Sequence, residues 1–270
     1  MSEYCKYFTG EYLFGDNFSE EKIARWYDEE AEAYADLYGK NIDTNRCLYG
    51  YHKINKLYGY RYLEGKKIFE NVLGFGSSWG FEFLPVIDKI KNLTIVESSS
   101  QTVSSKLGDI IPVYKIPKIS GKLDFPDNSF GLITCFDTLH HIPNVTFVLN
   151  ELFRVLQPEG YILLREPINS MGDWRTFRAG LTKNERGIPD AYLSKIIYEA
   201  NMEIIQKHYY SCMTSFFNRI FKLNFINFGG YLLFDKYLSK LFAFNIHYHP
   251  CNKLQRISPA SVFYILTKKR

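Results

Sequence analysis

Short apolar runs alternate with amphipathic stretches from about residue 66 to the end of the chain. Seven of these runs have the length and composition of strands: residues 66–73, 93–97, 111–114, 131–137, 160–166, 202–210 and 261–268. Apolar residues recur with the spacing of an α-helix at residues 77–90, 100–109, 144–156 and 188–201. This alternation predicts an α/β fold with a Rossmann-like, doubly wound parallel sheet of about seven strands. Ligands of such sheets bind at the carboxyl ends of the strands.

Residues 1 to about 60 precede this pattern and are predicted to form an N-terminal helical cap. Ser19 suits the N-cap position, two acidic residues follow it, and Phe18 is placed to contact Ile23 across the helix start. One helical face carries Ile23, Trp26, Tyr27, Ala31 and Tyr34. This face either packs on the core or lines the substrate cavity.

A segment rich in Phe, Leu, Tyr and Asn, at about residues 211–259, interrupts the pattern before the last strand. Residues 216–223 and 231–244 have the spacing of amphipathic helices. The insertion either covers the active site, contacts a second copy in a homodimer, or adds to the core. We expect residues 61–270 to form one domain that contains this helical insertion.

Composition and charge narrow the class of protein. Hydrophobic residues make up 46% of the 270 residues, which excludes a disordered chain, and the net charge of +4 is too small to indicate a nucleic-acid binder. No run of 18 apolar residues indicates a membrane span, and the first residues lack an apolar signal core. The five cysteines are scattered without metal-ligand spacing. We therefore expect a cytoplasmic protein with reduced cysteines.

A glycine-rich turn and an acidic strand end indicate a nucleoside cofactor. Gly74 and Gly76 follow the first predicted strand, and glycines at this position let the backbone approach a ligand closely. Glu97 ends the second strand, where a carboxylate accepts hydrogen bonds from both ribose hydroxyls. The pattern departs from a dinucleotide fingerprint because Trp79 occupies the position of the third glycine. Nicotinamide and adenosyl cofactors both remain open on these residues alone.

The segment downstream resembles class I S-adenosylmethionine-dependent methyltransferases. The similarity covers roughly residues 66–210 and is carried by short matches in the right order at residues 125–130, 132–135, 139–143 and 151–161. The resemblance implies S-adenosylmethionine as the cofactor. It places the methionine moiety at Gly74, Phe75 and Gly76, the ribose at Glu97 and Ser98, the adenine near Ser120, and the reacting groups beside Cys135, Phe136 and Asp137. Val72 and Ile119 stand where this family often has acidic residues.

Two adjacent histidines, His140 and His141, are the candidates for proton transfer to and from an acceptor. A hydroxyl group that attacks a methyl group needs a base near its proton, and histidine titrates near neutral pH. We expect one histidine to pack and the other to act, with His141 as the base and His140 as the alternative. Glu166, at the end of the fifth strand, is placed to orient a histidine or to hold an acceptor hydroxyl.

A polar loop after the fifth strand is the candidate acceptor site. Its residues Asp173, Trp174, Arg175, Arg178 and Arg186 suit a phosphorylated sugar, since guanidinium groups bind phosphate in bidentate fashion and Trp packs on a sugar or base. This loop and residues 15–37 resemble methyltransferases linked to surface-polysaccharide (capsule) biosynthesis, which implies O-methylation of a sugar or a nucleotide sugar. The alternatives are a lipid-like or quinone-like acceptor, or a non-catalytic cofactor-binding protein. His247, His249 and Cys251 have metal-ligand spacing but no supporting acids, so we expect metal-independent transfer.

Overall fold

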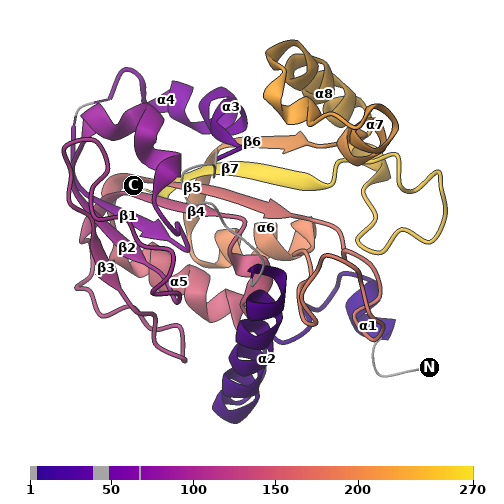
Figure 1. Cartoon of the computed structure of the whole chain (residues 1–270), viewed down its shortest axis with the longest axis horizontal. Helices are drawn as coiled ribbons and strands as arrows, with labels where there is room; N and C mark the ends of the chain where they lie inside the picture. The colour runs from indigo at the N-terminus through magenta and orange to yellow at the C-terminus, as the bar shows by residue number, and fades with distance from the viewer. Residues whose placement is uncertain (1–4, 39–48, 67, 270) are drawn as a thin grey trace.

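A seven-stranded sheet runs through the computed structural model, which describes residues 5–38, 49–66 and 68–269, without the side chains of residues 31–38 (Figure 1). The strands are β1 (Phe69–Phe75), β2 (Ile90–Val96), β3 (Val113–Lys115), β4 (Phe130–Phe136), β5 (Leu156–Pro167), β6 (Met202–Tyr210) and β7 (Ser261–Lys268). Their order in the sheet is β3-β2-β1-β4-β5-β7-β6. The first five strands are parallel, and β7 lies antiparallel between β5 and β6.

Helices cover both faces of the sheet. The longer ones are α2 (Glu20–Tyr38), α5 (Val145–Val155), α6 (Asp190–Glu199), α7 (Thr214–Phe221) and α8 (Gly229–Leu241). The shorter elements are α1 (Cys5–Phe8), α3 (His52–Asn55), η1 (Lys56–Tyr60), α4 (Arg61–Leu63), η2 (Phe81–Lys89), η3 (Leu139–His141), η4 (Phe225–Asn227) and η5 (Ala243–Asn245). The helices α5 and α6 lie on one face, and α3, α4 and α8 lie on the other (Figure 1).

Two hydrophobic clusters, one on each face, hold these layers together. One joins apolar residues of α5 and α6 to alternate positions of the central strands, for example Leu149 and Ile196 with Leu73. The other joins the segment from α3 to α4 and the helix η2 to the strand residues that face the opposite side of the sheet, for example Tyr58 to Phe263. The central strands are buried on both faces, which explains why they read as continuous apolar runs.

The predicted fold class is confirmed, and the structure corrects three details. The last strand is antiparallel rather than parallel, because β6 and β7 form an antiparallel pair that inserts next to β5. The helix expected at residues 77–90 is the 3₁₀ helix η2, which contains Pro85 and a kink at Val86. Residues 100–109 form turns and bends instead of a helix.

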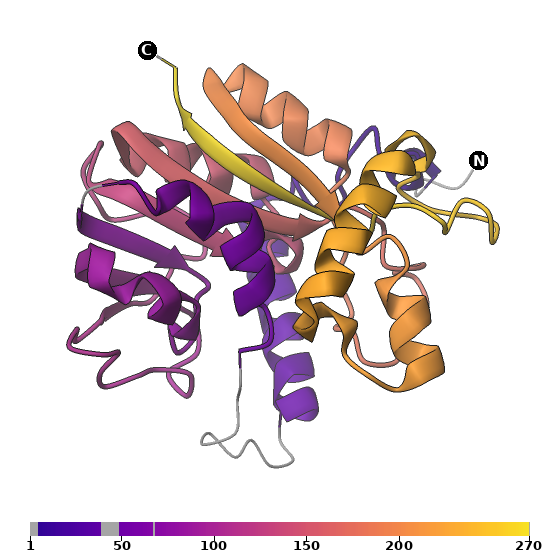
Figure 2. The ribbon, with the colours of Figure 1, turned by 90° about the horizontal axis from the view of Figure 1, so that it is seen from above.

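The predicted insertion contains α7 and α8, which lie near one another at one end of the sheet in both views (Figures 1 and 2). A hydrogen-bonded pair of hydroxyl groups on Thr214 and Tyr231 joins them. Many of their apolar side chains are exposed, including Phe216, Phe221 and Phe234. Along the described ranges, no helix combines the length and the apolar character that crossing a membrane requires.

The N-terminal helix α2 packs against the main body rather than standing apart. Ile23 and Trp26 on its predicted apolar face are buried, and the Trp26 indole donates a hydrogen bond of 2.8 Å to the backbone carbonyl of His141. Ala31 and Tyr34 of the same predicted face lie outside the described side chains. The division into a cap and a main domain stays a prediction.

Candidate active site at the carboxyl edge of the sheet

A tight glycine turn follows β1 at the point where the strand order reverses between β1 and β4. Gly76 and Gly80 have φ values of +68° and +72°, which favour glycine. A Cβ atom at Gly76 would lie 2.3 Å from the Thr138 methyl group, so the turn leaves no room for a side chain there. Gly74 lies inside β1, so the turn begins at Gly76, two residues later than the sequence suggests.

Glu97 lies directly after β2, beside this turn. One carboxylate oxygen accepts a hydrogen bond of 2.9 Å from the backbone N–H of Ser78, within the glycine turn. The other accepts hydrogen bonds from the backbone N–H groups of Ser98 and Ser99. These donors fix the carboxylate at the edge of the sheet, next to the predicted methionine-binding turn. The carbonyl group of Ser120 accepts a hydrogen bond of 2.8 Å from the side chain of Asn144, three residues after the histidine pair.

Several residues that were predicted to contact the cofactor have side chains in the core. Phe75, Cys135 and Phe136 are all buried within the two hydrophobic clusters. Burial raises the pKa of the Cys135 thiol well above its usual range, which makes it unreactive. Only the backbone of these residues borders the carboxyl edge. Asp137 differs, because it has a positive φ of +51° and its carboxylate contacts the buried Arg165 guanidinium at 2.7 Å.

A buried carboxylate supports the glycine turn from below. Glu82 is 4% exposed, and its Oε1 accepts hydrogen bonds from Ser77 (2.9 Å) and Thr134 (2.6 Å). Burial raises the pKa of Glu82 to about 7, against the opposing effect of these two hydrogen bonds. Glu82 therefore links the turn after β1 to the neighbouring strand β4.

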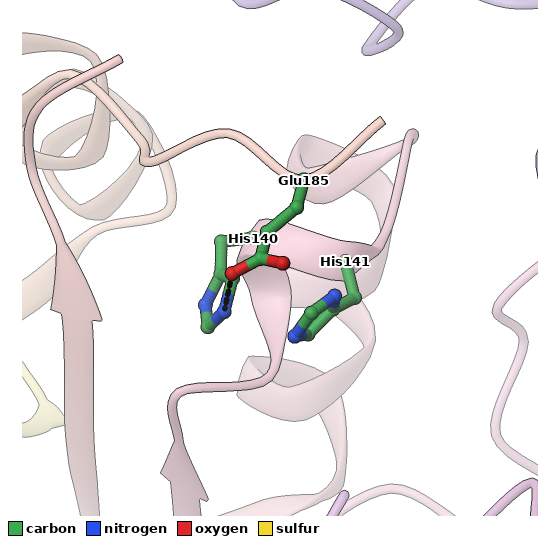
Figure 3. A group of neighbouring side chains, drawn as sticks. All are labelled: His140, His141 and Glu185. Atoms are coloured by element: carbon green, nitrogen blue, oxygen red, sulfur yellow. Dashed lines mark ion pairs between the residues drawn. The ribbon is translucent and has the colours of Figure 1, made fainter. Parts of the chain in front are cut away.

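The two histidines lie on the short helix η3, just after β4, with their rings 4.1 Å apart (Figure 3). His140 is buried, and its Nδ1 lies 2.8 Å from Oε2 of Glu166. His141 is partly exposed, and its Nδ1 lies 3.2 Å from Oε2 of Glu30, a residue of α2. Glu185 approaches His140 from the other side, with 3.7 Å between Oε1 and Nε2. Three carboxylates from three separate segments thus converge on the histidine pair.

Backbone N–H groups hold each of these carboxylates in place. Glu166 accepts hydrogen bonds from the N–H groups of residues 138, 139 and 140, at the start of η3. Glu185 accepts one from Thr182, and Glu30 accepts one from Asn184. The carboxylate positions are therefore set by the fold, which is the arrangement that a binding or catalytic site requires.

The two histidines have opposite protonation tendencies. Burial disfavours the charged form of His140, but the hydrogen bond and charge of Glu166 outweigh it and raise the His140 pKa. Burial and the neighbouring charge of His140 lower the pKa of His141. Near neutral pH, His141 is therefore the neutral member of the pair, as a proton acceptor must be.

The arginines of the polar loop differ in their surroundings. Arg186 is fully buried, and its guanidinium donates to the backbone carbonyl groups of Phe14, His140, Ile142 and Pro143. Arg178 donates to three backbone carbonyl groups of its own loop. The structure thus places both in roles that hold loops together. Arg175 is the more exposed, and it pairs with Asp173 at 2.6 Å.

Trp174 is also part of the packing rather than an exposed platform. Its side chain is 8% exposed, its ring stacks on Phe8 and Phe14, and its indole N–H donates to the carbonyl group of Ser170. Trp174 therefore attaches the first part of the loop to the N-terminal segment. The last part of the loop contains Glu185, which lies beside His140.

Sequence reasoning missed Glu30, Glu185, Glu82 and Arg165 as members or supports of this site. Glu30 could have been found from the sequence, because it lies four residues after Trp26 on the apolar face of α2. A carboxylate on a buried face needs a polar partner there. His249 contacts Ser170 through Nδ1 (2.7 Å). Among the described residues, the group of three with ligand atoms close enough for one metal ion is His140, His141 and Glu185, not the set at residues 247–251.

Comparison with known proteins identifies the central part of the chain. Residues 73–164 match the model of the methyltransferase domain family. This part of the chain, which is less than half of its length, is similar to a class I S-adenosylmethionine-dependent methyltransferase domain. Sterol 24-C-methyltransferase of Yarrowia lipolytica is 32% identical over 85 residues, which are 29% of this chain and 22% of that enzyme. The match thus spans about a fifth of this relative's length.

Solved structures show the same fold over most of the chain. YcgJ of Bacillus subtilis is 16% identical with a TM-score of 0.52, covering 82% of this chain and all of that one. An S-adenosylmethionine-dependent methyltransferase of Mesorhizobium loti is 11% identical with a TM-score of 0.50, covering 77% and 94%. The [4+2]-cyclase SpnF is 12% identical with a TM-score of 0.51, covering 93% and 96%. Because a cyclase shares it, the fold alone does not decide the reaction.

S-adenosylmethionine is the cofactor that this domain implies, and the residues present fit it. The turn at Gly76 has a positive φ and packs on Thr138 too closely for any side chain, and Glu97 supplies a fixed carboxylate beside it. The histidine pair follows β4, the strand next to β1. The cofactor edge and the histidine pair therefore meet at Thr138, which contacts the glycine turn and begins the segment bound by Glu166.

Proposed function

We propose that this protein transfers the methyl group of S-adenosylmethionine to a hydroxyl group of a small molecule that lies against His141. The observation that carries the proposal is the neutral, partly exposed histidine beside the cofactor edge, with its ring oriented by Glu30. S-adenosylmethionine, when bound, supplies an electrophilic methyl group. The chain supplies the proton acceptor and the alignment of the acceptor.

Each residue of the site has a distinct part in this proposal. His141 accepts the proton from the acceptor hydroxyl as the hydroxyl oxygen attacks. Glu30 holds the His141 ring and stabilises its protonated form, since the two groups lie 3.2 Å apart. Glu166 fixes His140 and the N–H groups at the start of η3 and acts as a positioning residue. Trp26 and Arg186 hold the backbone carbonyl groups of the histidine segment.

The test is the turnover of His141→Ala with the acceptor and S-adenosylmethionine. We expect kcat to fall by about 10²–10⁴ while the affinity for S-adenosylhomocysteine stays the same, as for the loss of a general base. His247→Ala is the matched control, because His247 is exposed and lies outside the site. If His140→Ala loses turnover in this way and His141→Ala does not, the two roles are reversed. If neither does, proton transfer by histidine is not part of the reaction.

For the acceptor, we propose a sugar or a nucleotide sugar. Three buried carboxylates around the histidine pair favour an uncharged acceptor with hydroxyl groups, one of which lies against His141. The same carboxylates repel an anion at the reacting centre, so a phosphate group would have to lie away from the histidines. Arg175 is the exposed guanidinium of the loop and is the residue we assign to such a phosphate. The resemblance to capsule methyltransferases supports surface-polysaccharide biosynthesis in the cytoplasm as the setting.

A panel of nucleotide sugars, followed by mass detection of a methyl gain, tests the acceptor class. With an accepted nucleotide sugar, Arg175→Lys should raise the KM of the acceptor more than about tenfold and leave cofactor binding unchanged, because Lys cannot make a bidentate contact. Arg25→Lys is the control, since Arg25 is an exposed residue of α2 paired with Glu21. Equal turnover of the phosphate-free sugar would contradict the role of Arg175.

A lipid-like acceptor is the second candidate. The exposed apolar side chains of the insertion favour it, and so does the partial similarity to a sterol 24-C-methyltransferase. Turnover of an apolar acceptor, with no methyl gain on any sugar, would decide for this candidate.

A further inference from the structure

The histidine pair and Glu185 form a group of side chains that the methyl-transfer proposal uses only in part. One ligand atom from each of His140, His141 and Glu185 lies within 4.8 Å of the other two. The Nε2 atom of His140 and the Oε1 atom of Glu185 are 3.7 Å apart, close to the separation of two ligands that share one ion (Figure 3).

We propose that His140, His141 and Glu185 bind one divalent transition-metal ion of the Zn²⁺ type. Two imidazoles and one carboxylate form the ligand set of open zinc and non-haem iron sites, whereas Mg²⁺ and Ca²⁺ prefer oxygen ligands alone. Three protein ligands leave a coordination position for water or for an acceptor oxygen.

Outer carboxylates of the kind found around metal-bound histidines are present. A histidine that binds a metal through one ring nitrogen usually donates its other N–H to a carboxylate or a carbonyl group. His140 has this arrangement, with Nδ1 against Glu166 and Nε2 toward Glu185. His141 has its Nδ1 against Glu30, so that Nε2 would be the ligating atom. Glu185 is itself fixed, since its second oxygen accepts the Thr182 N–H.

The charge balance of the group also favours a cation. Glu30, Glu166 and Glu185 bring three carboxylates to two imidazoles in a largely buried place. The guanidinium of Arg186 donates to backbone carbonyl groups of the same histidine segment. A metal ion displaces any proton on the ligating nitrogen of His140, and the three carboxylates and Arg186 then leave two negative charges, which a divalent ion would balance.

This inference rests on the proposed function only for its effect on activity. A metal ion and a proton cannot use the same ring nitrogen, so a bound ion stops His141 from acting as a base. We therefore expect saturating Zn²⁺ to inhibit methyl transfer and a chelator to restore it. Methyl transfer that requires the ion would overturn the base role of His141 and leave the metal site standing.

The binding test uses the full chain after treatment with a chelator. Calorimetry measures the binding of Zn²⁺, and the visible absorption of Co²⁺ measures the binding of that ion. We expect one ion per chain, no comparable binding of Mg²⁺, and unchanged binding in His247→Ala. Glu30→Gln, which alters an outer partner alone, should weaken binding by about 10–100-fold. Glu185→Gln removes a ligand and should weaken it further, with circular dichroism confirming that both variants are folded.

Two results would overturn the proposal. One is the lack of saturable Zn²⁺ binding by the wild-type chain. The other is binding that Glu185→Gln and His141→Ala leave unchanged, because the ion would then be held elsewhere. Loss of folding in one variant leaves the other as the test.

Discussion

Replacing Glu82 by Gln tests whether the carboxylate beneath the glycine turn is protonated in the folded protein near neutral pH. Gln keeps the oxygen that accepts hydrogen bonds from Ser77 and Thr134, but it cannot ionise. The substitution therefore removes the titration of residue 82 with little change in packing. Any effect that depends on pH is then due to the charge.

The size of the effect follows from the raised pKa of Glu82, which burial moves from 4.5 to about 7. Between these pH values the folded protein keeps a proton that the unfolded chain has lost, so the free energy of unfolding falls as pH rises. Below pH 4.5 both states are protonated, and above pH 7 both are ionised. A difference of this size corresponds to about 3 kcal/mol lost across the window.

Urea unfolding of both proteins between pH 4 and pH 8.5 measures this difference. We expect Glu82→Gln to gain about 3 kcal/mol relative to wild type as pH rises through the window, because the other groups titrate in both proteins. Glu70→Gln is the control, since Glu70 is exposed and paired with Lys91, and its effect should stay within about 0.5 kcal/mol. A difference between Glu82→Gln and wild type that does not depend on pH would refute the buried, protonated carboxylate.

Two further substitutions test the supports of the site. Gly76→Ala places a Cβ atom 2.3 Å from the Thr138 methyl group at a positive φ. We expect this substitution to weaken S-adenosylhomocysteine binding more than about tenfold, as measured by calorimetry. Gly65→Ala is the control and should leave binding unchanged, because nothing lies within 4 Å of a Cβ atom at residue 65. Arg186→Met leaves several buried carbonyl groups without donors and should lower the free energy of unfolding by about 3 kcal/mol or more in urea; a loss below 1 kcal/mol would contradict its role in holding the histidine segment.

The sequence predicts the sheet and its carboxyl edge because these follow from local patterns. Apolar runs bounded by turns mark the strands, and the end of a strand fixes where the next polar residue lies, as for Glu97 and His141. The antiparallel position of β7 was missed, since periodicity carries no strand direction. The 3₁₀ form of η2 was missed because an apolar periodicity outweighed the effect of Pro85.

The members of the site that were missed depend on contacts between distant segments. Glu30 and Asn184 are 154 residues apart in sequence, yet a hydrogen bond joins them next to the histidines. Arg186 looks like a phosphate ligand in the sequence, since an arginine in a polar loop gives no sign that backbone carbonyl groups surround it. Such assignments require the packed structure, because burial decides what a charged side chain can contact.

Calorimetric titration of S-adenosylhomocysteine into the wild-type chain and into Glu97→Ala tests whether the edge beside the glycine turn binds the adenosyl cofactor. We expect saturable binding by wild type, a loss of about 1.5–3 kcal/mol in Glu97→Ala as two charge-assisted hydrogen bonds to the ribose disappear, and no comparable binding of NADH. Equal binding by Glu97→Ala, or NADH binding as tight as that of S-adenosylhomocysteine, would contradict it.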